Sequence, residues 1–250
     1  GVLDHGFVQL LNISGPTRRN AAIFDGDDTD PANAARMSFN QVELDRTREM
    51  DLKLCDYLMK NKHTSPFEMV EVWVEMKMPI FVARQFVRHR TACINEVSGR
   101  YVHLPAEWYI PEVVGKKAKD KKQGQTDGLY WQTEQQFKED LNRVCEQSYQ
   151  LYNNAIMTVV APAHARVFLH LNHYTHWIWK QDLHNLMHFL SLRVDSHAQI
   201  EAQKYAEAVI QLLRPHLSHS MALFDKYRRI QAQVTAAVGE ELIFPDGYAK

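Results

Sequence analysis

Residues 70–90 read VEVWVEMKMPIFVARQFVRHR, and this stretch contains the clearest structural signal in the chain. From Val70 to Met78, apolar residues alternate with Glu71, Trp73 and other larger or polar residues, the period of a strand with one buried face. Pro79 suits the first turn of a helix, where its missing N–H is not needed. Apolar residues then recur at helical spacing up to Val87. The stretch therefore predicts a strand, a short helix, and a basic segment where the helix ends.

The same periodicities predict the elements on either side. Before the stretch we expect a strand over residues 6–13 and helices over 31–37 and 42–61. After it we expect helices over 130–160 and 163–171, a strand over 174–180, a helix capped by Asp182 that runs to Arg193, and a helix capped by Ser196 that runs to Leu213. Helices and strands are neither segregated nor regularly alternating, so the fold class is α+β rather than a doubly wound sheet.

The length of 250 residues favours a single domain over residues 1–250. Between residues 115 and 128, lysines are interrupted by polar residues without an apolar period, which predicts a mobile surface insertion. Lys+Arg number 29 against Asp+Glu 30, so no overall positive field draws the chain to nucleic acid or to an anionic membrane.

The three cysteines, Cys55, Cys93 and Cys145, are widely spaced and odd in number. They form no Cys-x-x-Cys pair, which favours a reducing compartment. No apolar run approaches the roughly 20 residues that span a bilayer, and no signal-peptide pattern is evident near residue 1. We therefore expect a soluble, cytoplasmic protein without a membrane partner. Cys55 and Cys93 are expected to be packing residues, although the arginines near Cys93 leave a nucleophilic role open.

Residues 88–101, RHRTACINEVSGRY, gather three arginines, a histidine, a glutamate and a serine around one glycine. Arginine binds phosphate through two parallel hydrogen bonds, and the N–H groups of Ser98 and Gly99 could approach an oxyanion. A solvated helix cap would explain Arg88-His89-Arg90 alone. The dense set that follows favours a site for a phosphorylated small molecule.

Other common sites find little support. Thirteen histidines suggest a metal, and His184 and His188 share a helix face, but Asn185 stands where the zincin pattern needs Glu. We therefore expect no metal. The chain has neither a Gly-x-Gly-x-x-Gly motif nor a Walker loop, so any nucleotide must be bound mainly by side chains.

Arg88-His89-Arg90 with Ser98 eight positions later resembles the signature of the flavin-dependent thymidylate synthases, the ThyX family. Four other blocks resemble that family in the expected order: residues 35–39, 63–68, 79–85 and 192–199. The resemblance implies an α+β fold with a central, mostly antiparallel sheet and long helices. It also implies an NADPH-dependent methyltransferase of dTMP biosynthesis, which uses FAD and takes its carbon from methylenetetrahydrofolate. No cysteine nucleophile is needed in that chemistry.

The resemblance also implies site residues. Arg193 would polarise the uracil ring as the catalytic residue. The other dUMP-binding residues would be Gln85, Phe86, Val87, Arg88, Glu96, Val97, Ser98, Gly99, Arg100 and Arg166. FAD would be bound by Ser65, Arg88, His89, Arg90, Glu96, Asp182, His184 and His188, where Asp182 and His184 replace the Asn and Arg often found in the family. Ser38, His63 and Tyr101 would lie on the folate side.

As in the family, the assembly would be a homotetramer with active sites shared between subunits. The alternative is a binding module of another class, a basic aromatic surface that grips RNA or a nucleotide without chemistry. The near-neutral charge and the absence of a recognisable RNA motif argue against it. Flavin absorbance of the purified protein would separate the two interpretations.

Overall fold

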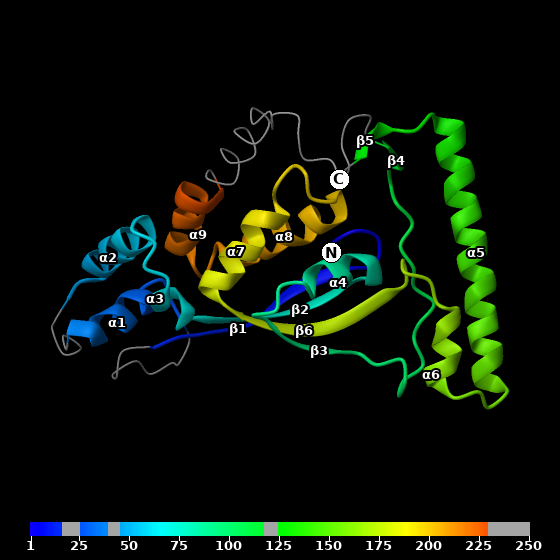
Figure 1. Cartoon of the computed structure of the whole chain (residues 1–250), viewed down its shortest axis with the longest axis horizontal. Helices are drawn as coiled ribbons and strands as arrows, with labels where there is room; N and C mark the ends of the chain where they lie inside the picture. Colours follow the sequence, from blue (N-terminus) through cyan, green and yellow to red (C-terminus); the bar gives the residue numbers. More distant parts are fainter. Residues whose placement is uncertain (17–25, 40–45, 118–124, 230–250) are drawn as a thin grey trace, which may run out of the picture.

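The computed structural model describes residues 1–16, 26–39, 46–117 and 125–229, and its centre is a four-stranded sheet (Figure 1). The strand order is β1-β2-β6-β3, and every neighbouring pair is antiparallel. The α+β class with an antiparallel sheet is therefore confirmed. The strands are β1 (Phe7–Ser14), β2 (Glu71–Pro79), β6 (Tyr174–Asp182) and β3 (Cys93–Glu96).

The hydrophobic core lies on one face of this sheet, where the predicted alternation of β2 is confirmed. Val74 pairs with Trp179 and Met76 with Trp177, and all four are buried. This face packs against α4 (Ile80–Phe86), α7 (Leu183–Arg193) and α8 (Ile200–Leu213) (Figure 1). The ring of Phe86 meets that of Phe189 at 4.8 Å between centroids, nearly edge to face. Aromatic packing thereby fixes α4, and with it the start of the basic segment, against α7.

Two further groups of elements lie at the two ends of the long axis (Figure 1). One end holds α1 (Asp30–Arg36), the 3-10 turn η1 (Met37–Phe39), α2 (Arg48–Lys60) and α3 (Ser65–Glu68). The other holds α5 (Trp131–Met157), α6 (Pro162–Ala165) and the 3-10 turn η2 (Arg166–Phe168). After α8 the chain forms α9 (Ser218–Phe224) and the π-helical turn η3 (Asp225–Arg229). No described helix is both long enough and apolar enough to cross a membrane.

Several expected boundaries were wrong. Residues 93–96 form β3, a strand that the sequence did not predict, because it lies at the sheet edge with all four side chains exposed. The helix expected from Ser196 begins at Ile200, since Asp195 first closes a turn by accepting hydrogen bonds from His197 and Ala198. The helix expected over 163–171 is the short α6 followed by η2, and an extended Leu169 ends it.

Two predicted segments lie partly outside the described residues. The helix expected over 42–61 is α2, which begins at Arg48 after Thr47 caps it by accepting from the N–H of Met50 at 3.4 Å. Around the lysine-rich segment, β4 (Gly115–Lys117) and β5 (Gln125–Gly128) pair as a two-stranded sheet. Residues 118–124 lie outside the described residues, so a mobile insertion within one domain stays a prediction.

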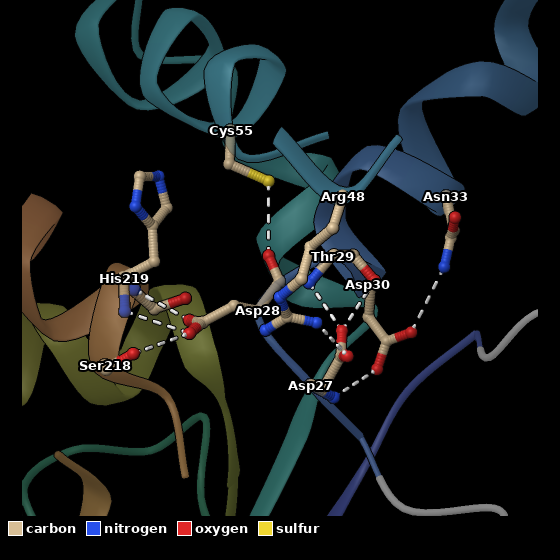
Figure 2. A network of polar contacts seen from close by, with 10 residues as sticks. Asp27, Asp28, Thr29, Asp30, Asn33, Arg48, Cys55, Ser218 and His219 are labelled. Atoms are coloured by element: carbon tan, nitrogen blue, oxygen red, sulfur yellow. Dashed lines mark hydrogen bonds and ion pairs between the residues drawn. The ribbon is translucent and has the colours of Figure 1, made fainter. Parts of the chain in front are cut away.

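A buried carboxylate ties α9 to the loop before α1 (Figure 2). Asp28 is 1% exposed, and it accepts hydrogen bonds from the backbone N–H groups of His219 at 2.9 Å and Ser220 at 2.7 Å. The Ser218 hydroxyl adds a third at 3.4 Å. These donors belong to the first turn of α9, whose N–H groups have no partner within the helix. Asp28 therefore fixes the direction in which α9 and η3 leave the core.

We expect Asp28→Ala to lower the free energy of unfolding by about 3 kcal/mol, because it leaves buried N–H groups without an acceptor. Urea unfolding followed by circular dichroism measures the change. Asp140→Ala is the control, since Asp140 forms only exposed contacts with Arg143 and Gln136, and its urea midpoint should stay that of the wild type. An unchanged midpoint for Asp28→Ala would show that α9 is held by its apolar contacts alone.

Candidate functional site

A cavity of about 380 Å³ lies where the turn after β3 meets the start of β6, Ile80 of α4, and η2. Such a volume lies within the usual range of small-molecule sites. Six of its lining residues are among those predicted to bind the nucleotide: Glu96, Val97, Ser98, Gly99, Arg100 and Arg166. Five others were not predicted: Ile80, Leu104, Leu169, Tyr174 and Thr175. Only the pairing of β3 with β6 brings Tyr174 and Thr175 here, so no sequence signal marks them.

Backbone hydrogen bonds hold the turn that carries the predicted anion-binding residues. The N–H of Val97 donates to the carbonyl of His176 at 2.8 Å and so continues the β3–β6 ladder. The N–H of Tyr101 then donates to the carbonyl of Ser98 at 2.9 Å and closes the turn. A Cβ at Gly99 would come within 2.8 Å of Leu104 Cδ1, so glycine allows the backbone to approach the cavity wall.

The charge of the cavity wall favours an anion. Within the described ranges, neither Arg100 nor Arg166 forms an ion pair. Arg100 instead donates to the Tyr101 hydroxyl at 2.7 Å and lies over that ring. The carboxylate of Glu96 accepts a short hydrogen bond from the Thr175 hydroxyl and therefore stays on the cavity side. Two uncompensated guanidinium groups beside one oriented carboxylate suit a ligand with a phosphate and a hydroxyl-bearing sugar.

Arg193 is the last residue of α7 and does not line this cavity. Its side chain contacts the C-terminal end of α4. Its guanidinium donates to the Gln85 carbonyl at 3.3 Å and hydrogen-bonds His89 Nε2 at 3.1 Å. Its Nε is buried and has no hydrogen-bond partner among the described residues. Burial and the charge of Arg193 lower the pKa of His89 to about 4. The imidazole is therefore neutral, and its Nε2 can accept the hydrogen bond from Arg193.

The three residues between the core of α4 and the basic triplet have different surroundings. Phe86 is fully buried among Trp179, Phe189 and Tyr205, so its ring packs in the core. Val87 is exposed. The Gln85 side chain donates to Gln199 Oε1 at 2.6 Å, a contact that sequence reasoning missed although Gln199 ends one of the family-like blocks.

Three residues expected to bind the flavin, Asp182, His184 and His188, lie at the N-terminal end of α7. Asp182 caps the helix as predicted, since its two carboxylate oxygens accept from the backbone and side-chain N–H groups of Asn185 at 2.9 and 2.7 Å. His184 Nδ1 lies 3.0 Å from Arg228 of η3, which no motif predicted. The ring of His188 lies 6.5 Å from that of His89. The structure thus brings His89, His184 and His188 to one side of α7.

Three predicted ligand residues lie at the other end of the molecule from the cavity. Ser38 is in η1, Ser65 begins α3, and His63 lies two residues before α3. All three are exposed. Their elements lie at the opposite end of the long axis from α6 (Figure 1). Tyr101, by contrast, lies beside the cavity, because its hydroxyl accepts a hydrogen bond from Arg100, which lines the cavity. A single chain therefore does not bring Ser38, His63 and Ser65 to the cavity that contains Arg166.

The cysteines and histidines suggest no second chemistry. Cys55 is buried as expected, whereas Cys93 is exposed on the edge strand β3, so its predicted packing role was wrong. Sequence alternation could not reveal this, because all four residues of β3 are exposed. In the part of the chain that the structure describes, no three His, Cys, Asp or Glu side chains are arranged to hold a metal.

A family model described as thymidylate synthase complementing protein matches residues 22–217. The chain is 40% identical over 228 residues to the flavin-dependent thymidylate synthase of Ehrlichia ruminantium, covering 90% of this chain and 72% of that protein. It is 42% identical over 226 residues to the enzyme of the same name from Thermus thermophilus, covering 90% of this chain and 78% of that protein.

The chain is also similar to solved structures. The UMP/dUMP methylase PolB from Streptomyces cacaoi, bound to 5-Br dUMP, superposes with a TM-score of 0.78 at 25% identity. The match covers 91% of this chain and 98% of that one. The same protein bound to 5-Br UMP gives a TM-score of 0.76 at 26% identity, covering 90% of this chain and 95% of that one.

Proposed function

The chain belongs to the family of flavin-dependent thymidylate synthases, and we propose that it binds dUMP in the cavity beside residues 96–100. It is an enzyme that methylates dUMP to dTMP with a flavin. The binding module without chemistry, considered above, is therefore wrong. The observation that carries the cavity assignment is Arg100 and Arg166, two guanidinium groups without an acidic partner among the described residues, on one cavity wall.

The phosphate of dUMP would be bound by Arg100, Arg166, Ser98 and the N–H of Gly99, because charged hydrogen bonds to phosphate are the strongest available there. Glu96, oriented by Thr175, and Val97 would lie along the sugar. We place Gln85, Val87 and Arg88 on the base side, where Gln199 fixes the amide of Gln85. Phe86 contributes by packing α4 against the sheet.

The residues expected to bind FAD fit an anionic dinucleotide. Arg88 and Arg90 are exposed, and neither forms an ion pair with a described carboxylate. Together with Ser65, His89, Glu96, Asp182, His184 and His188, they offer cationic and hydrogen-bonding groups to a diphosphate and its sugars. When bound, FAD reduced by NADPH would supply the hydride, and methylenetetrahydrofolate would supply the carbon.

Arg193 is the residue that we assign to catalysis. Its guanidinium stays charged even though burial lowers its pKa. A buried Nε–H without a partner in the described residues can donate to a carbonyl oxygen of uracil. This donor would stabilise the enolate-like form of the uracil ring, the form in which C5 is nucleophilic toward the carbon donor. The neutral His89 and the Gln85 carbonyl hold the other side of the guanidinium in place.

We infer a homotetramer with sites shared between subunits, supported by two features of the single chain. Arg193, Ser38, His63 and Ser65 do not line the cavity of their own chain, so another subunit would complete it. On α5, three large apolar residues spaced seven apart, Phe137, Val144 and Leu151, are 45%, 42% and 51% exposed. Such spacing forms one stripe along a helix, which a second copy could cover. Ser38 and His63 would then reach the folate side next to Tyr101.

The direct test is dTMP formation by the purified full-length chain supplied with dUMP, methylenetetrahydrofolate and NADPH. We expect a yellow protein that forms dTMP, and we expect Cys93→Ala to retain at least half of that activity. Cys93 is exposed and lies outside the cavity lining, and the chemistry needs no thiol nucleophile. A folded, flavin-loaded Cys93→Ala protein without activity would contradict the mechanism. The absence of dTMP from flavin-loaded wild type would contradict the proposal itself. The cytoplasmic location and the absence of nucleic acid as a partner stay predictions.

A further inference from the structure

Arg228 is a half-buried arginine whose charge nothing described in the chain neutralises. Its neighbour Arg229 pairs with Glu207 and Asp225, and Arg214 also pairs with Asp225. Arg228 is instead hydrogen-bonded to His184 Nδ1 at 3.0 Å. It forms no ion pair with any carboxylate in the described ranges. A guanidinium partly removed from water without a counter-charge is costly unless a ligand supplies that charge.

The partner of Arg228 cannot supply the charge, because it is a neutral imidazole. His184 Nδ1 accepts from the guanidinium and therefore carries no proton, which leaves Nε2–H as a second donor. Burial, followed by the charge of Arg228, lowers the pKa of His184 against the smaller opposing effects of Glu68 and Asp182. Asp182 is already engaged with Asn185. Arg228 and His184 thus lie in contact, and each has an N–H group that could donate to the same ligand.

This pair lies at one end of a row of basic groups along α7. His184 and His188 are one helical turn apart, the ring of His188 lies 6.5 Å from that of His89, and His89 Nε2 lies 3.1 Å from Arg193. The helix rises about 13 Å from residue 184 to residue 193. A molecule that touches both ends must be extended and anionic, as a dinucleotide is. The Arg193 end adjoins the assigned pyrimidine side, so the Arg228 end would face the part of the cofactor far from the reacting ring.

The position of Arg228 depends on contacts that lie away from His184, His188 and His89. η3 directly follows α9, and Asp28 fixes the first turn of α9 (Figure 2). Arg228 lies beyond residue 217, where the match to the family model ends. We propose that Arg228, with His184, binds the diphosphate of FAD from the C-terminal segment, an inference that rests on the proposed function.

The test compares Arg228→Gln with Arg229→Gln, a matched control that removes a neighbouring ion-paired arginine. Each full-length protein, freed of flavin, is titrated with FAD, ADP and riboflavin. Loss of one charged hydrogen bond corresponds to a 10- to 100-fold weaker affinity, roughly. We expect Arg228→Gln to lose this much for FAD and ADP and to bind riboflavin, which has no phosphate, as the wild type does. Arg229→Gln should bind all three ligands as the wild type does.

Three results would overturn the inference. Arg228→Gln could bind FAD and ADP as tightly as wild type. It could weaken riboflavin as much as FAD, which would indicate a structural role. Arg228→Lys, which keeps the positive charge, could bind ADP no better than Arg228→Gln. That result would show that the charge at position 228 does not bind the phosphates. If wild type itself bound no FAD, the proposed function would fail. If wild type binds FAD and Arg228→Gln binds it equally, only the present inference fails.

Discussion

Arg193→Ala is expected to keep its bound flavin while forming dTMP about 10²- to 10³-fold more slowly. This is the usual loss when one donor that stabilises developing charge is removed. The guanidinium is held on one side by His89 Nε2 and the Gln85 carbonyl, and its buried Nε–H is left for a ligand. The flavin should remain because Arg88, Arg90 and Arg228, which we propose as its diphosphate-binding residues, are unchanged. Single-turnover dTMP formation and the flavin absorbance per subunit measure the two effects.

Arg143→Ala is the control for this variant, because Arg143 forms an exposed ion pair with Asp140 on α5 and does not line the cavity. Its turnover should match that of wild type. Normal turnover in flavin-loaded Arg193→Ala would remove Arg193 from the catalytic assignment. Equal loss of flavin and of turnover would instead make it a cofactor-binding residue.

Two inactive variants should restore activity when they share one oligomer. Arg100 lines the cavity that we propose binds dUMP, whereas Arg193 of the same chain does not. If one site takes Arg100 from one subunit and Arg193 from another, chains with Arg100→Ala and chains with Arg193→Ala together form some intact sites. Random assortment across a symmetric interface gives both wild-type arginines to about a quarter of the sites. Activity should therefore rise from near zero to about a quarter of wild type.

The experiment co-expresses the two variants with different tags and purifies through both tags, so that only mixed oligomers are assayed for dTMP. A mixture of Arg100→Ala chains carrying both tags is the control and should stay inactive. Mixed oligomers that bind FAD but remain as inactive as either parent would show that each subunit builds its own pocket. Flavin content is measured in the same samples, so a failure to bind the cofactor is not mistaken for a failure to share sites.

The sequence predicted the elements whose side chains alternate or repeat locally. Strand β2 follows from the alternation over Val70–Met78, and the start of α7 follows from Asp182, whose carboxylate caps the helix as expected. The turn at Ser98–Arg100 could be recognised because its residue types suit an anion wherever the turn lies. β3 escaped prediction because an exposed edge strand needs no apolar alternation, and its pairing is decided by β6.

By itself, then, the sequence predicted the fold class, most of the helices and strands, the family, and most of the charged residues of the candidate site. These properties depend on neighbours a few positions apart or on motifs of fixed spacing. Only the tertiary structure decided that Arg193 and Ser65 lie outside the cavity lined by Ser98–Arg100 and Arg166, and that Arg228 meets His184. Those contacts join residues tens of positions apart, so they depend on how whole elements pack across the sheet, which local periodicity does not record.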